Sequence, residues 1–380
     1  MLDQPLHWVS RARSSFIPDF SRKVFCIFGV TFDNVTIDDV LTTIDEAVRT
    51  RRQCIITTPN LHFVTRSASD VEFRDSIVRS DLSLVDGMPL VWASRLFQVD
   101  VKGRVAGADL FERMRQRRES GVRLKVYVFG GPPGVAKLAS DRLNEEDGGL
   151  CCVGYRSPGY GSVEELSSSE IIREINASGA DFLLVALGAK KGQSWIQQNG
   201  LALDVPVISH LGAVINFTAG TIRRAPVPLQ NVGLEWAWRI SRDPALWRRY
   251  LSDGWTALGM ATRTSLNAGL SVLRARGQGT SAVSKIAVAE TESDLAIEIR
   301  GAWNASGLAP LRVAFQAHSG SDKRLSLDVG AITNLDSAAI ALLMMLRRHR
   351  LDIGQGWHVT GASARLKQIC RIYGASDLVD

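Results

Sequence analysis

The sequence of 380 residues lacks a continuous apolar stretch of about 18 residues, the length that crosses a bilayer as a helix. Residues 1–20 mix charged and apolar side chains and lack the apolar core of a signal peptide. Cysteine is scarce and shows neither CxxC nor metal-ligand spacing; the five are Cys26, Cys54, Cys151, Cys152 and Cys370. These absences predict a cytoplasmic protein with reduced thiols, no metal site and no membrane span.

Lysine is absent from residues 221–276, although this segment holds nine arginines against three acids. Its excess of six equals the net charge of the whole chain, +6. The segment also holds four of the nine tryptophans, which are Trp236, Trp238, Trp247 and Trp255. Arginine mixed with tryptophan suits an anionic, partly apolar surface such as a membrane. Nucleic acid is the competing partner, and the lack of lysine and of a nucleic-acid-binding module disfavours it.

Strand and helix patterns alternate through the first two-thirds of the chain. This alternation is typical of an α/β domain with a mainly parallel, Rossmann-like sheet. The expected strands cover residues 24–30, 54–58, 82–85, 124–129, 150–155, 180–187 and 206–208. The expected helices cover residues 37–49, 63–80, 88–96, 109–119, 135–143 and 163–178.

A change in composition separates a second unit from the first. Residues 269–284 are rich in glycine, serine and other small residues and are interpreted as a linker. Beyond it we expect strands at 295–300, 311–317, 324–329 and 357–360, with helices at 337–350 and 364–373. The predicted organisation is an extension (1–22), an α/β domain (23–233), a basic amphipathic appendage (234–268), the linker (269–284) and a small α/β domain (285–380).

Polar residues follow three expected strands, where open α/β sheets bind ligands. Thr58 and Asn60 follow one strand, Asp86 follows the next, and a Gly-Gly-Pro-Pro-Gly turn at residues 130–134 follows another. The turn offers backbone amides to a phosphate, with a plain tight turn as the alternative. Asp86 is a candidate general base or a simple turn residue. Together with the arginines, this set favours an enzyme that binds an anionic nucleotide.

The motifs also occur in a recognisable order. They are TTPN (57–60), LSLVDGMPLVWASRL (82–96), GRVAGADLF (103–111), VYVFGGPPGVA (126–136), INASGADFLLVALGAKK (175–191), HLGAVINFTAGTIRRAP (210–226), LEWAWR (234–239) and DPALWRRYL (243–251). This series resembles the WecG/TagA/CpsF glycosyltransferases, family 26, over about residues 23–251. Eight blocks in order make the resemblance specific.

The resemblance implies an inverting enzyme without metal or cofactor that uses a UDP-sugar and a polyprenyl-diphosphate-linked acceptor. Such an enzyme is expected in surface polysaccharide biosynthesis, peripheral on the inner face of the cell membrane. Asp86 matches the family's base, Thr58 and Asn60 match its pocket, and Gly107 and Asp109 occupy its AGxDL block. The further substrate-binding candidates are His62, Gly130, Gly131, Gly188, Lys191 and His210. The candidates for diphosphate and membrane contact are Arg223, Arg224, Arg239, Arg248 and Arg249.

The sequence departs from the family at several positions. Gly192 replaces a glutamine, Gln193 an acid, and Asn216 a frequent aspartate, while Ala245 and Leu246 replace an arginine pair. These changes leave the sugar open. For His62 and His210, an ordinary packed or hydrogen-bonded histidine is the alternative to a ligand contact. For the tryptophans, core packing is the alternative to membrane contact.

The second unit resembles the STAS fold over about residues 285–380. The resemblance rests on LSLDVGAITNLDSAAIALLMMLRRHR (325–350) and WHVTGASARLKQICRIYG (357–374). It implies a protein-interaction module with a protein partner, in which Ser337 occupies a position that can be phosphorylated. A phosphate there would lie at a helix N-terminus beside Asp336. The alternative is that Ser337 only caps the helix.

Two other hypotheses remain for the whole chain. The departures at Gly192 and Asn216 favour a catalytically reduced scaffold or regulator that acts through its STAS unit. A dinucleotide-dependent oxidoreductase is the other, and it is disfavoured because no GxGxxG follows the first expected strand.

Overall fold

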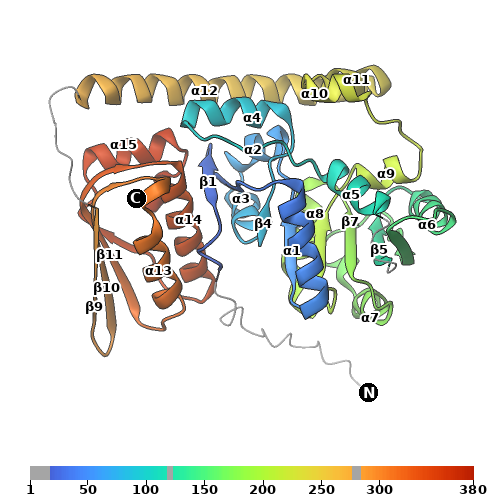
Figure 1. Ribbon diagram of the computed structural model, residues 1–380, viewed down its shortest axis with the longest axis horizontal. Helices are drawn as coiled ribbons and strands as arrows, with labels where there is room; N and C mark the ends of the chain where they lie inside the picture. Colours follow the sequence, from blue (N-terminus) through green and yellow to red (C-terminus); the bar gives the residue numbers. More distant parts are fainter. Residues whose placement is uncertain (1–17, 118–122, 276–283) are drawn as a thin grey trace.

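The computed structural model describes residues 18–117, 123–275 and 284–380. Figure 1 shows two α/β units side by side, with a long helix lying across both of them. The larger unit contains a six-stranded sheet, the smaller one a four-stranded sheet, and a separate two-stranded hairpin lies between them. The expected mainly parallel α/β domain followed by a second α/β domain is therefore confirmed.

The six-stranded sheet is parallel throughout, in the order β4-β3-β8-β7-β5-β6. Its central strands are almost entirely buried, as expected when helices cover both faces of a parallel sheet. The strand order places the carboxyl ends of β4, β3, β8 and β7 next to one another. The bounds are β3 (Cys54–Thr57), β4 (Leu82–Ser83), β5 (Leu124–Gly130), β6 (Leu150–Arg156), β7 (Phe182–Ala186) and β8 (Val207–His210).

Local capping signals set several helix boundaries around this sheet. Thr36 and Asp39 form a reciprocal capping box at the start of α1. The helix expected over residues 63–80 is two helices, because the Asp70 side chain accepts a hydrogen bond from the Phe73 N–H and starts a new one. The bounds are α1 (Ile37–Thr50), α2 (Leu61–Ser67), α3 (Val71–Val78), α4 (Met88–Ser94), α5 (Gly107–Gln116), α6 (Val135–Glu145), α7 (Ser169–Ala177), α8 (Ala189–Asn199) and α9 (Val214–Thr218).

The strand expected over residues 24–30 is an antiparallel hairpin, β1 (Val24–Ile27) and β2 (Val30–Asp33). Phe28 and Gly29 form its two-residue turn, and both have positive φ (50° and 77°). Two positive-φ residues match the turn whose twist suits a tight hairpin. A Cβ at Gly29 would lie 2.5 Å from the Gly374 carbonyl oxygen of the second unit, so the close approach of the two units also requires glycine there. The continuous apolar run concealed this turn.

The basic appendage consists of α10 (Val227–Asn231), α11 (Glu235–Arg242) and α12 (Trp247–Ala275), which lies across the top of both units in Figure 1. The linker expected at 269–284 needs correction, because residues 269–275 are the last turns of α12. Residues 276–283 lie outside the described residues. None of the helices within the described residues is both long and apolar enough to cross a membrane.

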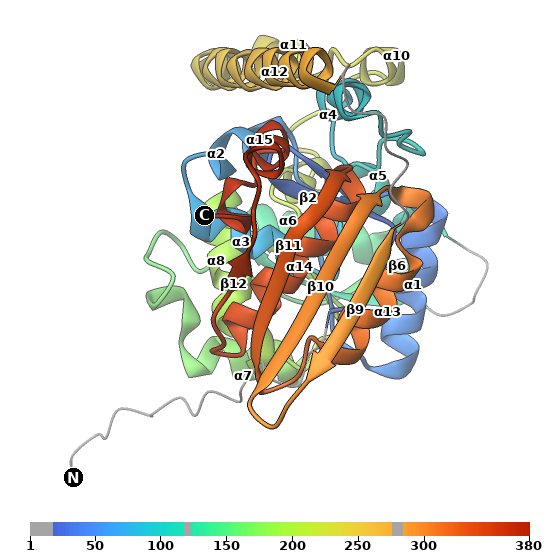
Figure 2. The same cartoon turned by 90° about the vertical axis from the view of Figure 1, so that its left-hand side faces the viewer.

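The second unit is a sheet in the order β12-β11-β10-β9, with α13 and α14 behind it in Figure 2. The strand expected at 311–317 is wrong, since this segment lies within α13. Leu311, Ala314 and Phe315 are buried at helical spacing, and Pro310 stands in the first turn of the helix. The bounds are β9 (Lys285–Glu290), β10 (Asp294–Trp303), α13 (Ala309–His318), β11 (Arg324–Leu335), α14 (Ser337–Asp352), β12 (His358–Thr360) and α15 (Ala364–Ile372).

The start of α14 joins the two units. Ser337 is 2% exposed, and its hydroxyl both accepts a hydrogen bond from the Cys26 N–H (2.8 Å) and donates one to the Cys26 carbonyl (2.7 Å). The alternative that Ser337 only caps α14 is wrong, because Asp336 caps the helix by accepting a hydrogen bond from the Ala339 N–H (2.9 Å). Ser337 therefore connects α14 to the backbone of β1.

Ion pairs between α3 and the second unit surround this contact. Their shortest distances are 2.8 Å for Arg79–Asp352, 2.5 Å for Arg348–Asp75 and 2.6 Å for Arg74–Asp377. All six side chains are at most 30% exposed. The described end of the expected N-terminal extension also takes part, because Phe20 is buried in the core of the second unit. Residues 1–17 lie outside the described residues.

Helix α12 connects the second unit to the larger one. Near its middle, the Thr264 hydroxyl donates to the Ile372 carbonyl at the end of α15 (3.1 Å). About three turns earlier, Asp253 on the same helix contacts His62 and Thr65 on α2. Because a helix is stiff over this length, the second unit and α2 together fix the position of α12.

Candidate active site

A cavity of about 1060 Å³ opens at the carboxyl ends of β3, β4, β7 and β8. Open parallel sheets bind ligands at this edge because the strand-to-helix loops converge there. Six of the predicted catalytic and substrate-binding residues line it, and they are Thr58, Asn60, His62, Asp86, Gly188 and His210. The sheet order therefore brings together side chains that are up to 152 positions apart in the sequence.

Asp86 stands just beyond the end of β4, with its backbone N–H donating to the Pro59 carbonyl (3.1 Å). Within the described residues, its carboxylate forms no side-chain hydrogen bond or ion pair. Burial and, to a lesser extent, the nearby Glu235 carboxylate raise the pKa of Asp86 to about 6, although Arg104 and Arg239 oppose the shift. A carboxylate with a pKa close to neutral and no fixed partner is suited to accept a proton.

A network of charged side chains lies beside Asp86. Arg104 binds Asp109 (2.6 Å) and approaches Glu235 of α11 (3.5 Å). The other Asp109 oxygen binds Arg224 (2.6 Å). Asp109 thus holds two arginines at the cavity, and Glu235 ties the appendage to them. Sequence reasoning missed Arg104 and Glu235, although Arg104 lies within the GRVAGADLF block.

Helix α11 and the first turns of α12 form the roof of the cavity. Arg239 is placed over the Phe217 ring (5.7 Å to its centroid), and Arg242 over Trp238 (4.9 Å). Burial lowers the pKa of Arg239, but the Tyr250 hydroxyl and the Glu235 and Asp86 carboxylates raise it by more, so the guanidinium stays charged. The guanidinium groups of the roof keep their positive charge, so they can bind an anionic group in the space between the roof and Asp86.

Two side chains of α2 hold α12, and with it the roof, in place. The Nδ1 atom of His62 lies 3.1 Å from both carboxylate oxygens of Asp253 on α12, and the Thr65 hydroxyl donates to Asp253 (2.8 Å). Burial alone would raise the pKa of Asp253, but these hydrogen bonds hold it below its ordinary value. His62 lines the cavity and also secures α12. No local sequence pattern indicates this pairing across 191 positions.

His210 is neutral at physiological pH, because burial lowers its pKa to about 4. Its ring fills the space that a side chain at residue 192 would occupy, since a Cβ on Gly192 would lie 2.2 Å from His210 Cδ2. The departure at Gly192 therefore fits this histidine. Gln193 is fully buried in α8, whereas Asn216 lines the cavity.

Several predicted residues are not brought to the cavity lining. Gly130 and Gly131 lie at the end of β5, where a Cβ would meet Ala186 and Ile215 at 2.5 and 2.6 Å. The Gly131 N–H donates to the Ala186 carbonyl (2.9 Å), so it is not free for a phosphate. The Lys191 ammonium donates to the Gly161 carbonyl (2.6 Å) instead.

The predicted arginines divide in a similar way. Arg223, Arg224, Arg239 and Arg249 line the cavity, together with Arg104 and Arg242. Arg248 does not line it, and its guanidinium is placed over the Trp247 ring (5.5 Å). Within the described residues, no cluster of three or more His, Cys, Asp or Glu side chains could hold a metal ion.

Comparison with known proteins gives two consistent findings. The model of the glycosyl transferase WecG/TagA/CpsF family matches residues 25–270, and that of the Mlab, STAS domain matches residues 286–380. Two similar proteins are called N-acetylglucosaminyldiphosphoundecaprenol N-acetyl-beta-D-mannosaminyltransferase. The one from Bacillus spizizenii is 27% identical over 197 residues, 52% of this chain and 74% of the relative. The one from Bacillus subtilis is 26% identical over 198 residues, which are 52% of this chain and 75% of the relative.

Proposed function

The chain belongs to the WecG/TagA/CpsF family of glycosyltransferases and also carries a STAS domain, and from this premise we propose its reaction. The proposed activity transfers a hexosyl or N-acetylhexosaminyl unit from a UDP-sugar to a polyprenyl-diphosphate-linked saccharide, with inversion at the anomeric carbon. The names of the two relatives support a lipid-linked diphosphate acceptor. We place the reaction in surface polysaccharide biosynthesis, such as that of an exopolysaccharide, on the inner face of the cell membrane.

The observation that carries this proposal is the Asp86 carboxylate, unpaired within the described residues, below a roof of arginines. Asp86 takes the proton of the acceptor hydroxyl as that oxygen attacks the anomeric carbon. The bond between the sugar and the diphosphate then breaks, and UDP leaves with the bonding electrons. Guanidinium groups of the roof, Arg239 and Arg249 among them, offset the charge that develops on the departing diphosphate. Thr58 and Asn60 help to bind the sugar nucleotide.

Incubation of the full chain with a panel of UDP-sugars and a lipid-diphosphate-saccharide acceptor tests the function. We expect one donor to be consumed, with UDP release that depends on the acceptor. No transfer with any donor would favour a catalytically reduced scaffold. Tight NAD binding without UDP binding would favour an oxidoreductase. We favour an active enzyme because the departures at Gly192 and Gln193 lie within packed protein around His210 and α8 and leave Asp86 in place.

We also propose that the appendage rests on the membrane. Four large apolar residues of α12 line the cavity at helical spacing, yet remain exposed: Trp247 (48%), Leu251 (52%), Trp255 (67%) and Leu258 (53%). Arginines flank them at Arg248 and Arg249. An exposed apolar stripe with cationic neighbours suits the interface of an anionic bilayer. Because the same stripe borders the cavity, a membrane-bound acceptor could enter beneath it.

Vesicles containing phosphatidylglycerol test this placement. The double substitution Trp255→Ser and Leu258→Ser removes apolar contact area, so we expect it to weaken vesicle binding about tenfold or more. Added salt should weaken binding of the unchanged chain. Leu138→Ser on α6 and Tyr160→Ser are controls, because both residues are exposed (48% and 94%) but lie away from α12. Equal binding by the double variant and the controls would contradict the proposal.

For the STAS domain we propose regulation of its own transferase domain, with Ser337 as the control point. Its hydroxyl is buried against β1, so a phosphate could be added only after α14 leaves β1. Separation would also break the contact between α15 and α12 and so release the roof. A separate protein partner that binds this face would have the same effect.

A further inference from the structure

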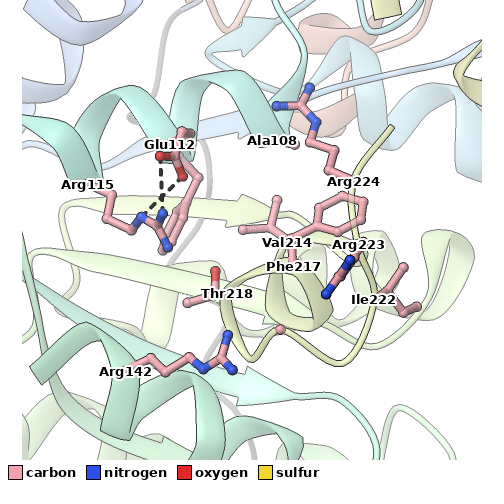
Figure 3. Close-up of a pocket in the computed structure, with 12 residues that line it drawn as sticks. Ala108, Glu112, Arg115, Arg142, Val214, Phe217, Thr218, Ile222, Arg223 and Arg224 are labelled. Atoms are coloured by element: carbon pink, nitrogen blue, oxygen red, sulfur yellow. Dashed lines mark hydrogen bonds and ion pairs between the residues drawn. The ribbon is translucent and has the colours of Figure 1, made fainter. Parts of the chain in front are cut away.

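A second cavity, of about 670 Å³, lies beside the Asp86 cavity between α5, α6 and α9 (Figure 3). The two cavities share a wall made of Ala108, Val214, Phe217 and residues 222–224. Asp86, Thr58, Asn60 and His210 do not line the second cavity. Its volume falls within the range of small-molecule sites, and no step of the proposed reaction requires it.

Four arginines and one carboxylate line this cavity: Arg115, Arg142, Arg223, Arg224 and Glu112. Arg115 is neutralised by Glu112 (3.1 Å) and by Glu146 outside the lining (3.5 Å). In the described part of the chain, the guanidinium groups of Arg142 and Arg223 have no hydrogen bond or ion pair. Unpaired guanidinium groups that converge on one space leave a local excess of positive charge, which attracts an anion.

Arg224 adds a second, independent sign of a missing partner. One of its terminal nitrogens binds Asp109, but its Nε and Nη2 atoms are buried and have no hydrogen-bond partner within the described residues. Buried polar atoms normally have a partner, so an unpaired donor in the wall that the two cavities share points to an anionic ligand in one of them. In Figure 3, Thr218 lies between Arg115 and Arg142. Thr218 forms no side-chain hydrogen bond within the described residues.

The rest of the lining is apolar and consists of Phe111, Val214, Phe217 and Ile222 beside the arginines. Guanidinium groups bind phosphate oxygens in pairs, and an apolar wall contacts a carbon skeleton. We propose that this arginine pocket binds a phosphate- or diphosphate-bearing organic ligand, at a site separate from the Asp86 cavity.

A ligand in the arginine pocket can affect the active site through the wall that the two cavities share. The Phe217 ring lines both cavities, and Arg239 of the roof lies 5.7 Å from its centroid. Arg224 also belongs to the Asp109–Arg104 network beside Asp86. An anion that pulls Arg224 away from Asp109, or that displaces the Phe217 ring, therefore changes the positions or the net charge of the side chains around Asp86.

Binding of soluble phosphates by the full chain tests this proposal without a transferase assay. The probes are pyrophosphate, UDP and farnesyl diphosphate, which represent a free phosphate, a nucleotide and a prenyl diphosphate. We expect Arg142→Glu and Arg115→Glu each to weaken binding of at least one probe about tenfold or more, because each replaces an attractive charge by a repulsive one. The probe affected identifies the source of the phosphate.

Matched controls lie on the same two helices. Lys137→Glu on α6 and Arg113→Glu on α5 make the same charge change at exposed positions outside the cavity, and we expect no effect on binding. Thr218→Val removes only a hydroxyl and should weaken binding severalfold without unfolding the chain. Equal binding by the Arg142, Arg115 and control variants would overturn the proposal, as would a failure of all three probes to bind the unchanged chain.

Discussion

Replacement of Asp86 by asparagine is expected to lower kcat of the proposed transfer by about 10²- to 10⁴-fold, the usual contribution of a general base. Asparagine keeps the shape of the side chain but cannot accept the acceptor's proton. Donor binding should change little, because the arginines and the Thr58–Asn60 side of the cavity remain. Steady-state kinetics with the donor identified in the panel measures both quantities. Full activity of Asp86→Asn would exclude Asp86 as the base.

The pH profile gives this prediction a second readout. The pKa of Asp86 is about 6, so kcat/KM of the unchanged chain should rise as the pH passes through this value and the carboxyl loses its proton. This rise is the acidic limb of the pH profile, and the Asp86→Asn variant should lack it. The folded pKa exceeds that of the unfolded chain, so ionisation costs folding stability as pH rises from about 4 to about 6. The variant should therefore have a higher Tm than the unchanged chain at pH 7.

Asp81 provides a matched control at the other end of the same strand. Burial also raises its pKa to about 6, but it precedes β4, at the end of the sheet opposite the cavity. Its carboxylate accepts a hydrogen bond from the Ile55 N–H (2.7 Å), which the amide oxygen of asparagine can also accept. Asp81→Asn should leave the acidic limb of kcat/KM unchanged. If Asp81→Asn also lost the acidic limb, the limb would not report the ionisation of Asp86, and its assignment to Asp86 would be wrong.

Replacement of Ser337 by glutamate is expected to separate the two domains and lower transferase activity. A carboxylate at this 2% exposed position would lie against the backbone of β1 without a partner, at a cost of several kcal/mol. Once α14 leaves β1, α15 no longer holds α12, and the roof loses one of its attachments. Hydrogen exchange should rise in β1, α12 and α15, and small-angle scattering should report a larger radius of gyration.

Ser337→Ala distinguishes charge from the loss of two hydrogen bonds. It should cost about 1–3 kcal/mol and leave the domains docked, because the ion pairs of Arg79 and Arg348 remain. Ser293→Glu adds the same charge at an exposed position between β9 and β10 and should have no effect. A docked, fully active Ser337→Glu variant would contradict the proposed control by this domain.

Local sequence patterns predicted much of the larger domain, but not the hairpin at its start or the helix α13 of the smaller domain. The buried strands 124–129 and 180–187 had clear apolar runs, and both exist as β5 and β7. Residues 24–30 also formed an apolar run, but it conceals a hairpin turn that is fixed by contact between Gly29 and Gly374. The segment 311–317 is short and apolar, and the hydrophobic periodicity of so few residues could not distinguish a strand from a helix.

The sequence alone determined the family, the alternation of strands and helices in the larger domain, and the placement of Thr58, Asn60 and Asp86 at strand ends. It could do so because these properties depend on neighbouring residues, and because parallel strands bring their carboxyl ends to one edge. Only the tertiary structure decided that His62 pairs with Asp253, that Ser337 is buried against β1, and that Arg115, Arg142 and Arg223 line a second cavity. Each of these depends on contacts between distant segments, and a side chain shows no local sign of the partner that packing will bring to it.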